Sequence, residues 1–283
     1  MRRESLVGST VGGYLLEERV GAGGTADVFR ATHSQHGTVA LKILRRRLRA
    51  DPVAVRRFLR EARYGERVVH PNVVRTIERG EDGPLHFLAL EWASGELLEA
   101  YARRAGPMRV ANVVDIVFEI AVAAQATHDA GIVHRDLKPD NVMFEMATRT
   151  IKLLDFGIAT AVNVSPDERL THEGHFVGTL LYLPPEALDG RMVTAAADQY
   201  SVAAIAYFLL SGCLPYTART PRAMLRQLTT EPPVPLNAAR EGLRFSDEME
   251  CVVMRALAKE PAKRYASVME FATAFRRCVS AAA

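Results

Sequence analysis

Short runs in which apolar residues dominate mark the first third of the chain, a pattern that is typical of β-strands. The runs are rich in Val and Leu, and glycine or polar turns separate them. Five runs fit this description: Tyr14–Val20, Ala26–Ala31, Thr38–Leu44, Val73–Glu78 and Leu85–Leu90. We therefore expect a five-stranded sheet in this part of the chain.

One helix should interrupt these strands. Asp51 is a suitable N-cap, and Pro52 suits the first position of a helix. Apolar residues then recur at helical spacing, at Val55, Phe58, Leu59 and Ala62. The spacing predicts a helix that ends at about Val68.

Beyond Ser94 the pattern becomes mainly helical, apart from a strand- and loop-rich segment at Ile132–Pro185. Helices are predicted at Ala111–Ala130, Thr194–Ser211, Pro221–Thr229, Asp247–Ala258 and Ser267–Cys278. A small β-rich lobe at 12–93 and a larger helical lobe at 94–278 make an α+β protein. A ligand cleft is expected where two such lobes meet.

Two stretches are apolar enough to be considered as membrane spans, Val113–Ala126 and Ser201–Leu210. Both are shorter than the roughly 20 residues that a span requires. The first also contains Asp115 and Glu119. We therefore expect both stretches to be helices of a protein core.

The composition is that of an ordinary globular protein: 283 residues, 48% apolar and 24% charged, with a net charge of +3. This charge is too small to indicate nucleic-acid binding. The three cysteines show no C-x-x-C spacing, so neither a disulfide framework nor a zinc site is predicted. No secretory signal follows the N-terminus, and a cytoplasmic location is expected.

A glycine-rich segment at residues 21–28 lies between the first two predicted strands. Small residues there let backbone N–H groups approach a phosphate without a clash from Cβ. A turn that merely connects two strands would have the same composition. The Gly-Lys-Ser/Thr ending of a P-loop is missing, so that type of phosphate site is disfavoured.

Lys42 lies in the apolar strand sequence Val39-Ala40-Leu41-Lys42. It is either a lysine that points into solvent or one that reaches the α- and β-phosphates of a nucleotide. In the second case Glu61 on the following helix would pair with its ammonium and keep it aimed.

The loop from His134 to Asn141 carries the most specific chemistry. Asp136 is placed to accept a proton from a hydroxyl nucleophile, and Lys138 can neutralise a phosphate during its transfer. Asn141 offers an oxygen ligand for Mg²⁺ without a further negative charge. Asp155-Phe156-Gly157 follows the apolar strand Ile151–Leu154, and Asp155 would be the main Mg²⁺ ligand.

These motifs occur in the order found in protein kinases. From about Tyr14 to Cys278 the chain resembles the catalytic domain of a eukaryotic-like (Hanks-type) serine/threonine kinase, most closely the bacterial ones. The resemblance implies the bilobal protein kinase fold, ATP as a substrate, and Mg²⁺ with Mn²⁺ as a substitute. It implies protein substrates, and Lys138 after Asp136 resembles the serine/threonine class.

The resemblance also assigns residues to roles. The adenine ring would lie among Val20, Val28, Ala40 and Met143, with the hinge at Leu90, Glu91 and Ala93. Phosphates would lie under Gly21, Ala22, Gly23 and Gly24. Thr179 would position Asp136 and Lys138, Asp198 would brace the loop backbone, and Glu186 with Arg264 would form a structural ion pair.

Control by phosphorylation is implied by Arg135, which precedes Asp136. Thr171 matches the usual primary phosphorylation site of the activation segment at residues 155–186. Its phosphate would pair with Arg135. A homodimer could carry out this phosphorylation between two copies of the chain.

Several features depart from the family pattern. Ala26 replaces the third glycine of the loop, and Gly65 stands where an apolar residue is usual. A glycine inside a helix costs about 1 kcal/mol, so we expect a helix that needs phosphorylation or a partner to seat it. The basic run Arg45–Arg49 is interpreted as a solvated linker rather than a docking site for an acidic partner or nucleic acid.

Two other functions stay open at this point. A nucleotide-binding pseudokinase scaffold would keep the fold without turnover, and Gly65 is the feature that allows it. A small-molecule phosphotransferase is the other alternative, and Arg135 and Lys138 argue against it.

Overall fold

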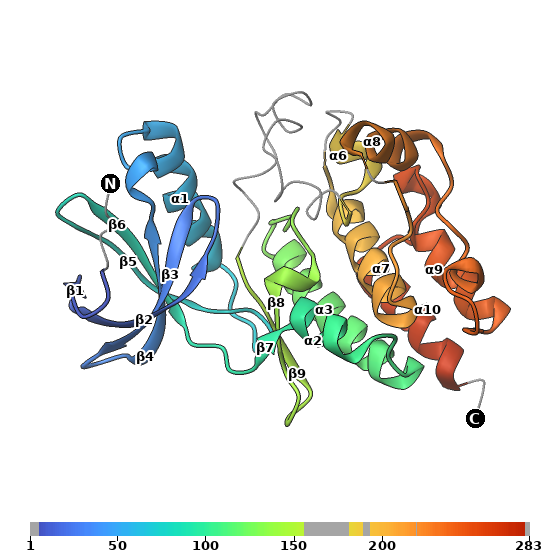
Figure 1. Ribbon diagram of the computed structural model, residues 1–283, viewed down its shortest axis with the longest axis horizontal. Helices are drawn as coiled ribbons and strands as arrows, with labels where there is room; N and C mark the ends of the chain where they lie inside the picture. Colours follow the sequence, from blue (N-terminus) through green and yellow to red (C-terminus); the bar gives the residue numbers. More distant parts are fainter. Residues whose placement is uncertain (1–5, 156–180, 189–192, 219, 281–283) are drawn as a thin grey trace. The chain divides into compact units, whose positions relative to one another are not determined.

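The computed structural model describes residues 6–155, 181–188, 193–218 and 220–280 (Figure 1). The chain divides into two compact units. We call them the sheet unit, Met1–Ser94, and the helical unit, Gly95–Ala283.

The sheet unit contains an antiparallel sheet with the strand order β1-β2-β3-β4-β6-β5. The strands are β1 (Thr10–Val11), β2 (Tyr14–Ala22), β3 (Ala26–His33), β4 (Gly37–Leu44), β5 (Thr76–Asp82) and β6 (Leu85–Glu91). All five predicted strands are present, and β1 is an additional strand of 2 residues at the edge.

The predicted position of β5 was wrong by several residues. Val73 and Val74 are buried, which gave the strand-like pattern, but the strand begins only at Thr76. It continues through polar residues because Asp82 pairs with Leu85 across a tight turn. Gly83 in this turn has a φ of 54°, which glycine adopts without strain.

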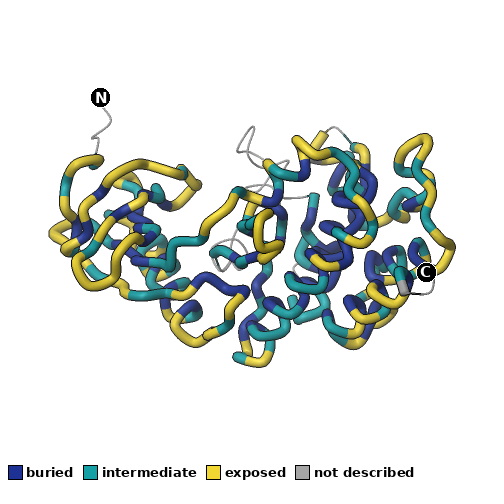
Figure 2. Tube along the Cα trace, turned by 90° about the horizontal axis from the view of Figure 1, so that it is seen from below, coloured by how far each residue is buried: buried dark blue, intermediate teal, exposed yellow. Residues whose placement is uncertain are grey.

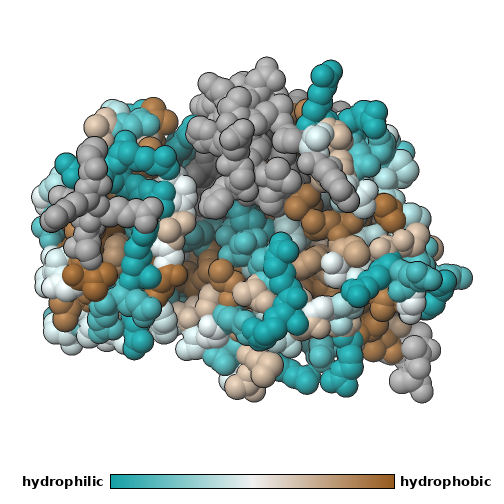
Figure 3. Space-filling view, viewed as in Figure 1, coloured by the Kyte–Doolittle hydropathy of each residue, from teal (hydrophilic) through white to brown (hydrophobic). Residues whose placement is uncertain are grey.

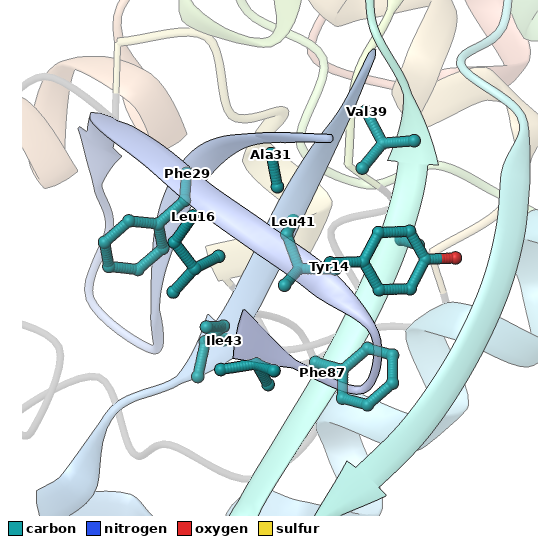
Figure 4. Packing of buried hydrophobic residues seen from close by; sticks show 10 residues of the cluster. Tyr14, Leu16, Phe29, Ala31, Val39, Leu41, Ile43 and Phe87 are labelled. Carbon is teal, nitrogen blue, oxygen red and sulfur yellow. The ribbon is translucent and has the colours of Figure 1, made fainter. Parts of the chain in front are cut away.

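One face of the sheet carries an apolar core built from β1 to β4 and β6 (Figure 4). Its buried residues are Val11, Tyr14, Leu16, Phe29, Ala31, Val39, Leu41, Ile43, Phe87 and Ala89. The Tyr14 hydroxyl points away from the other labelled side chains in Figure 4 and donates to Glu78 Oε2 at 2.8 Å. Burial, followed by this contact with Glu78, raises the pKa of the Tyr14 hydroxyl well above its usual range.

The other face of the sheet packs against helix α1 (Pro52–Gly65). Ala26, Leu44 and Leu88 of the sheet form a buried cluster with Phe58 and Ala62 of the helix. The helix begins as expected, because the Asp51 side chain accepts a hydrogen bond of 2.8 Å from Val53 N.

Helix α1 ends earlier than expected. Gly65 is its last residue, whereas a helix to about Val68 would have placed Gly65 in the interior. The full cost of an interior glycine therefore does not apply at this position. The low helix propensity of glycine therefore no longer supports our expectation that α1 is weakly held in place.

The helical unit begins with the three-stranded sheet β7-β8-β9 and continues with helices. Its strands are β7 (Glu96–Leu97), β8 (Val142–Glu145) and β9 (Thr150–Leu153). The α-helices are α2 (Leu98–Ala105), α3 (Val110–Asp129), α6 (Pro185–Leu188), α7 (Ala195–Ser211), α8 (Pro221–Thr230), α9 (Asp247–Ala256) and α10 (Val268–Ser280). Short 3₁₀ turns are η1 (Arg46–Leu48) in the sheet unit and η2 (Pro139–Asn141), η3 (Leu236–Ala238) and η4 (Pro261–Lys263) here.

The five helices predicted beyond Ser94 are confirmed, with ends shifted by a few residues. Helix α2 was not predicted. Its first turn has no side-chain cap, since Leu97 occupies the N-cap position. It therefore lacked the start signal by which a helix of 8 residues can be recognised.

Helix α7 forms the centre of the helical unit, and all of its residues from Ala197 to Ser211 are buried. Figure 2 colours the trace by the burial of each residue. Helix α3 packs against both α7 and α10. Among the described residues, α3 alone has the length and apolar composition of a membrane span, and half of that stretch is buried inside the protein. Hydrophilic and hydrophobic residues are interspersed over the visible face of each unit (Figure 3).

A buried ion pair fastens α6 to the end of the helical unit, as the resemblance implied. The Arg264 guanidinium donates to Glu186 Oε1 at 2.7 Å and to Oε2 at 2.8 Å. Its remaining donors reach the backbone oxygens of Ala196, Ala258 and Lys259. Both charged residues are nearly inaccessible to solvent, with Arg264 at 3% and Glu186 at 4%. Such complete pairing is what makes a buried charge tolerable.

Replacing one partner of this pair should therefore be costly. Glu186→Gln leaves the Arg264 charge buried without a counter-charge, and we expect the free energy of unfolding to fall by about 3–5 kcal/mol. Urea denaturation followed by circular dichroism measures the loss. Glu260→Gln is the matched control, because it breaks the exposed pair with Lys263 and should cost less than about 1 kcal/mol. Equal losses in the two variants would contradict the prediction.

Candidate active site

Lys42 and Glu61 form an ion pair inside the sheet unit. Lys42 Nζ lies 2.5 Å from Glu61 Oε1, and the two side chains are 7% and 11% exposed. Lys42 is on β4, two residues before Leu44, so both side chains point toward the face that α1 covers. Lys42 therefore does not point into solvent. The pair fixes the ammonium on this face of the sheet.

Three predicted adenine contacts lie on the same face as Lys42. Val28 pairs directly with Lys42 in the β3–β4 ladder, and directly opposed residues share a face. Ala40 lies two residues before Lys42 and pairs with Leu90 of β6. Strand register therefore brings together four of the predicted residues from three strands.

The glycine-rich turn joins β2 to β3. The Gly23 N–H donates to the Ala26 carbonyl at 2.9 Å and closes the turn. A Cβ added to Gly24 would meet no atom within 4 Å, so packing within the protein does not require glycine there. Ala22 is exposed, and Val20 lies in a register shift between Arg19 and Gly21. The turn thus leaves open space beside its backbone, as a phosphate cradle requires.

The predicted hinge lies at the end of β6. Glu91 pairs with Val39 of β4, and its N–H donates to the Arg75 carbonyl at 2.9 Å. Ala93 follows the strand, and its N–H has no hydrogen-bond partner within the described part of the chain. This N–H is therefore available to a ligand.

The helical unit brings together Asp136, Lys138 and Asn141. Lys138 Nζ lies 3.1 and 3.0 Å from the two carboxylate oxygens of Asp136. The Asn141 amide donates to Asp136 Oδ2 at 2.9 Å and to the Asp136 carbonyl at 2.8 Å. These contacts orient the Asp136 carboxylate, and all three side chains remain partly exposed.

Asp198 holds the backbone before Asp136. Its fully buried carboxylate accepts hydrogen bonds of 2.8 Å from the N–H groups of His134 and Arg135. Arg135 has a φ of 67°, in the left-handed region that a residue with a Cβ adopts only at a cost. The two hydrogen bonds offset this strain and fix the direction in which Asp136 leaves the backbone.

His128 is a functional neighbour that the sequence reasoning missed. Its Nε2 lies 2.8 Å from Asp198 Oδ2 and gives that carboxylate a third hydrogen bond. No motif surrounds His128 in the sequence, which is the pattern of a surface or packing residue. No signal in the sequence could have connected it with Asp198, which lies 70 residues further along the chain.

His134 connects the loop to the segment that leads to Asp155. Its Nδ1 accepts from the Asp136 N–H at 3.4 Å, so Nε2 carries the hydrogen and donates to the Leu154 carbonyl at 3.1 Å. The Leu154 N–H in turn donates to the Asn141 carbonyl at 2.9 Å. Asp155 follows with a φ of 26°, also in the left-handed region. These bonds place Asp155 next to the loop of Asp136.

Three further predicted site residues are Met143, Thr171 and Thr179. Met143 is half-buried in β8 and pairs with Leu97 and Lys152. Thr171 and Thr179 lie outside the described residues.

The donor set of the site fits a hard divalent cation. The Asn141 amide nitrogen is engaged with Asp136, and its amide oxygen has no partner among the residues that the structure describes. Asp155 supplies a carboxylate. Within the described ranges, no group of three or more His, Cys, Asp or Glu side chains is arranged to hold a metal. An ion at this site would therefore need further oxygen ligands from a bound substrate, as Mg²⁺ commonly does.

Comparison with known proteins places the chain in a family. Residues 14–275 match the protein kinase domain, and the chain belongs to this family. The resemblance drawn from the motifs and the predicted fold class are both confirmed. Protein kinases in general use ATP and a divalent metal ion.

Named relatives refine the assignment. The chain is 38% identical to the serine/threonine-protein kinase pkn3 of Myxococcus xanthus over 95% of its own length and 50% of that protein. It is 36% identical to the serine/threonine-protein kinase PknB of Mycobacterium tuberculosis over 91% of its length and 41% of that protein. The chain thus spans about half the length of the curated relatives it matches.

Solved structures agree with the sequence relatives. A crystal structure of the Mycobacterium tuberculosis PknI kinase domain matches with a TM-score of 0.74 at 29% identity. The match covers 96% of this chain and 98% of the PknI chain.

The bonds around Asp198 generate a prediction that needs no substrate. Asp198→Asn removes the charge and one of the acceptor oxygens, so the His134 and Arg135 amides should exchange hydrogen with solvent faster. We expect the free energy of unfolding to fall by about 2–4 kcal/mol, because hydrogen bonds to a buried charge are lost. Hydrogen–deuterium exchange read by mass spectrometry or NMR measures the first effect.

His128→Phe is the matched control for Asp198→Asn. It removes only the third hydrogen bond and keeps an aromatic ring of similar size. The His134 and Arg135 amides should stay protected in this variant. Unchanged exchange in Asp198→Asn would show that the carboxylate does not hold the loop.

Proposed function

We propose that this protein is a protein serine/threonine kinase that transfers the γ-phosphoryl group of ATP and requires Mg²⁺. The observation that carries the proposal is the arrangement of Asp136, Lys138 and Asn141 on a loop fixed by Asp198. A lysine and an amide both hold the carboxylate in one orientation. Phosphoryl transfer depends on such positioning more than on covalent chemistry.

Residues of the sheet unit would bind the nucleotide. Val28, Ala40 and Leu90 offer a continuous apolar surface for the adenine ring on the Lys42 face. Lys42, held by Glu61, would bind the α- and β-phosphates. The open backbone of the glycine-rich turn would cover the phosphates with N–H groups. The Ala93 N–H and Glu91 carbonyl would bond the adenine edge.

Asp136 would act on the protein substrate. Its carboxylate would orient the substrate hydroxyl and accept its proton during transfer. Lys138 contacts both carboxylate oxygens of Asp136 and would also neutralise charge on the transferred phosphate. Asn141, through its amide nitrogen, would keep Asp136 in place while its oxygen faces the metal.

Mg²⁺ is the metal that we propose, with Asn141 and Asp155 as its ligands from the protein. When bound, it neutralises the charge of the phosphates and orients them for transfer. The hard oxygen donors of these two side chains support Mg²⁺ and also permit Mn²⁺.

Serine and threonine hydroxyls are the proposed acceptors, and residues 12–278 the proposed kinase domain. Lys138 after Asp136 supports this choice, and the relatives pkn3 and PknB carry the name of serine/threonine-protein kinases. The physiological substrate would be a protein presented to the helical unit.

Labelled ATP tests the activity directly. The wild-type protein should phosphorylate itself or a general serine/threonine substrate such as myelin basic protein in the presence of Mg²⁺, and EDTA should abolish this. Asp136→Asn should lower kcat at least about 10³-fold and leave ATP affinity within about twofold, because the general base does not bind the nucleotide.

The outcomes separate the competing functions. A wild-type protein that binds ATP but does not turn over would be a nucleotide-binding pseudokinase scaffold. Phosphorylation of small molecules but of no protein in a substrate panel would indicate a small-molecule phosphotransferase. Either result would overturn the proposal.

Phosphorylation of Thr171 is the proposed means of control. Arg135 supports it, because its Nε is buried and has no hydrogen-bond partner among the residues that the structure describes. A buried guanidinium nitrogen without a partner is costly and favours a nearby anion. A phosphate on Thr171 would supply this anion.

Thr171→Ala should therefore lower kcat about tenfold or more in protein that has been phosphorylated, with Ser165→Ala as the matched control. Mass spectrometry should find phosphate on Thr171. Mixing wild type with a tagged Asp136→Asn protein tests transfer between two copies, since the inactive copy should become phosphorylated. Equal activity of Thr171→Ala and wild type would contradict this mode of control.

A further inference from the structure

The basic run Arg45–Arg49 lies between β4 and α1 and includes η1 (Arg46–Leu48). We expected a solvated linker with no specific role. The structure shows instead that Arg45, Arg47 and Arg49 each hydrogen-bond to another part of the sheet unit. Arg45 reaches Asp27 at the start of β3, and Arg47 reaches Gly24 in the glycine-rich turn between β2 and β3.

Arg47 binds the tip of this turn. Its guanidinium donates to the Gly24 carbonyl oxygen at 2.6 Å, across 23 positions of the sequence. The space where a Cβ of Gly24 would lie is open, since an added Cβ would touch nothing within 4 Å. Among the described residues, Arg47 is the side chain that hydrogen-bonds to Gly24 and so restrains the tip.

Because the peptide bond is planar, the contact between Arg47 and the Gly24 carbonyl also fixes the direction of the Thr25 N–H. In a trans peptide the carbonyl of one residue and the N–H of the next point in opposite directions. When Arg47 holds the Gly24 carbonyl toward the linker, the Thr25 N–H faces away from the linker. This N–H has no hydrogen-bond partner within the described ranges, so it is available to an anion.

A second contact fixes the base of the turn. Asp27 Oδ1 lies 2.5 Å from the Arg19 guanidinium and 3.0 Å from Arg45 Nε. The Arg45 N–H also donates to the Thr25 carbonyl at 2.9 Å. Residues on both strands of the turn are thus tied to the start of the linker.

Ala26 ties the same turn to α1. It is 1% exposed and belongs to the cluster that includes Phe58 and Ala62 of the helix. Its methyl group fills a place where the family pattern has glycine. Ala26 is packed against α1 and Asp27 is paired with two arginines. The part of the turn without such contacts is its tip at Gly24, which Arg47 holds.

We propose that Arg47 is a positioning residue for nucleotide binding, which fixes the tip of the glycine-rich turn so that its N–H groups face the phosphates. This inference rests on the proposed function of the turn. Arg47 acts through Gly24 and Thr25 and does not itself need to touch the nucleotide.

The experiment compares two ligands that differ only in the phosphates. Calorimetry with Mg-ATP and with adenosine should show that Arg47→Ala weakens ATP binding about five- to tenfold, the size of one charge-assisted hydrogen bond at an exposed site. Adenosine binding should not change. The KM for ATP should rise by the same factor with kcat within about twofold, and Tm should be unchanged.

Two further variants sharpen the test. Arg47→Lys keeps a cationic donor and should recover at least half of the lost affinity on a logarithmic scale. Arg60→Ala removes one positive charge from the exposed side of α1, where Arg60 has no ion pair among the described residues, and should leave both affinities unchanged. The control separates positioning from a general loss of positive charge.

The failures are distinguishable. Equal loss of ATP and adenosine affinity in Arg47→Ala would mean a structural role, and no loss of either would mean that the turn does not need Arg47. Both results overturn the inference and leave the proposed function intact. A wild-type protein that binds neither ligand would overturn the proposed function itself.

Discussion

The fully buried Asp198 carboxylate forms three hydrogen bonds, and the loop before Asp136 takes its shape from them. Removing a carboxylate from water is expensive unless every acceptor is used. Here the donors are two backbone N–H groups and one imidazole, so the charge also stabilises the left-handed Arg135. These hydrogen bonds make it possible to bury Asp198. They also orient Asp136, the proposed general base.

Each unit also contains a buried ion pair that connects two of its elements. Lys42 and Glu61 connect β4 with α1 in the sheet unit, and Glu186 and Arg264 connect α6 with the segment before α10. Neither pair is strong evidence of net stabilisation, because desolvation cancels much of the attraction. Their value is in geometry. Each pair fixes where the charged end of a long side chain lies.

The motifs supplied most of the residues that we propose to touch substrate, because phosphoryl transfer admits few residue types at each place. Strand register then explained why Val28, Ala40 and Leu90 accompany Lys42. The sequence did not predict the start of β5, because the apolar Val73 and Val74 precede the strand, which begins at Thr76. It also did not predict α2, which begins without a capping side chain. In the first case a local signal points to the wrong residues, and in the second the local signal is missing.

The residues that hold others in place are the ones that sequence reasoning misses, and His128 and Arg47 show why. A histidine or an arginine in isolation is compatible with a surface, a core or a site, and its spacing says nothing about a partner far along the chain. What decides the role is the acceptor that the fold brings near, the Asp198 carboxylate for one and the Gly24 carbonyl for the other. A motif therefore identifies the chemistry of a site, whereas the precision of that chemistry depends on residues that belong to no motif.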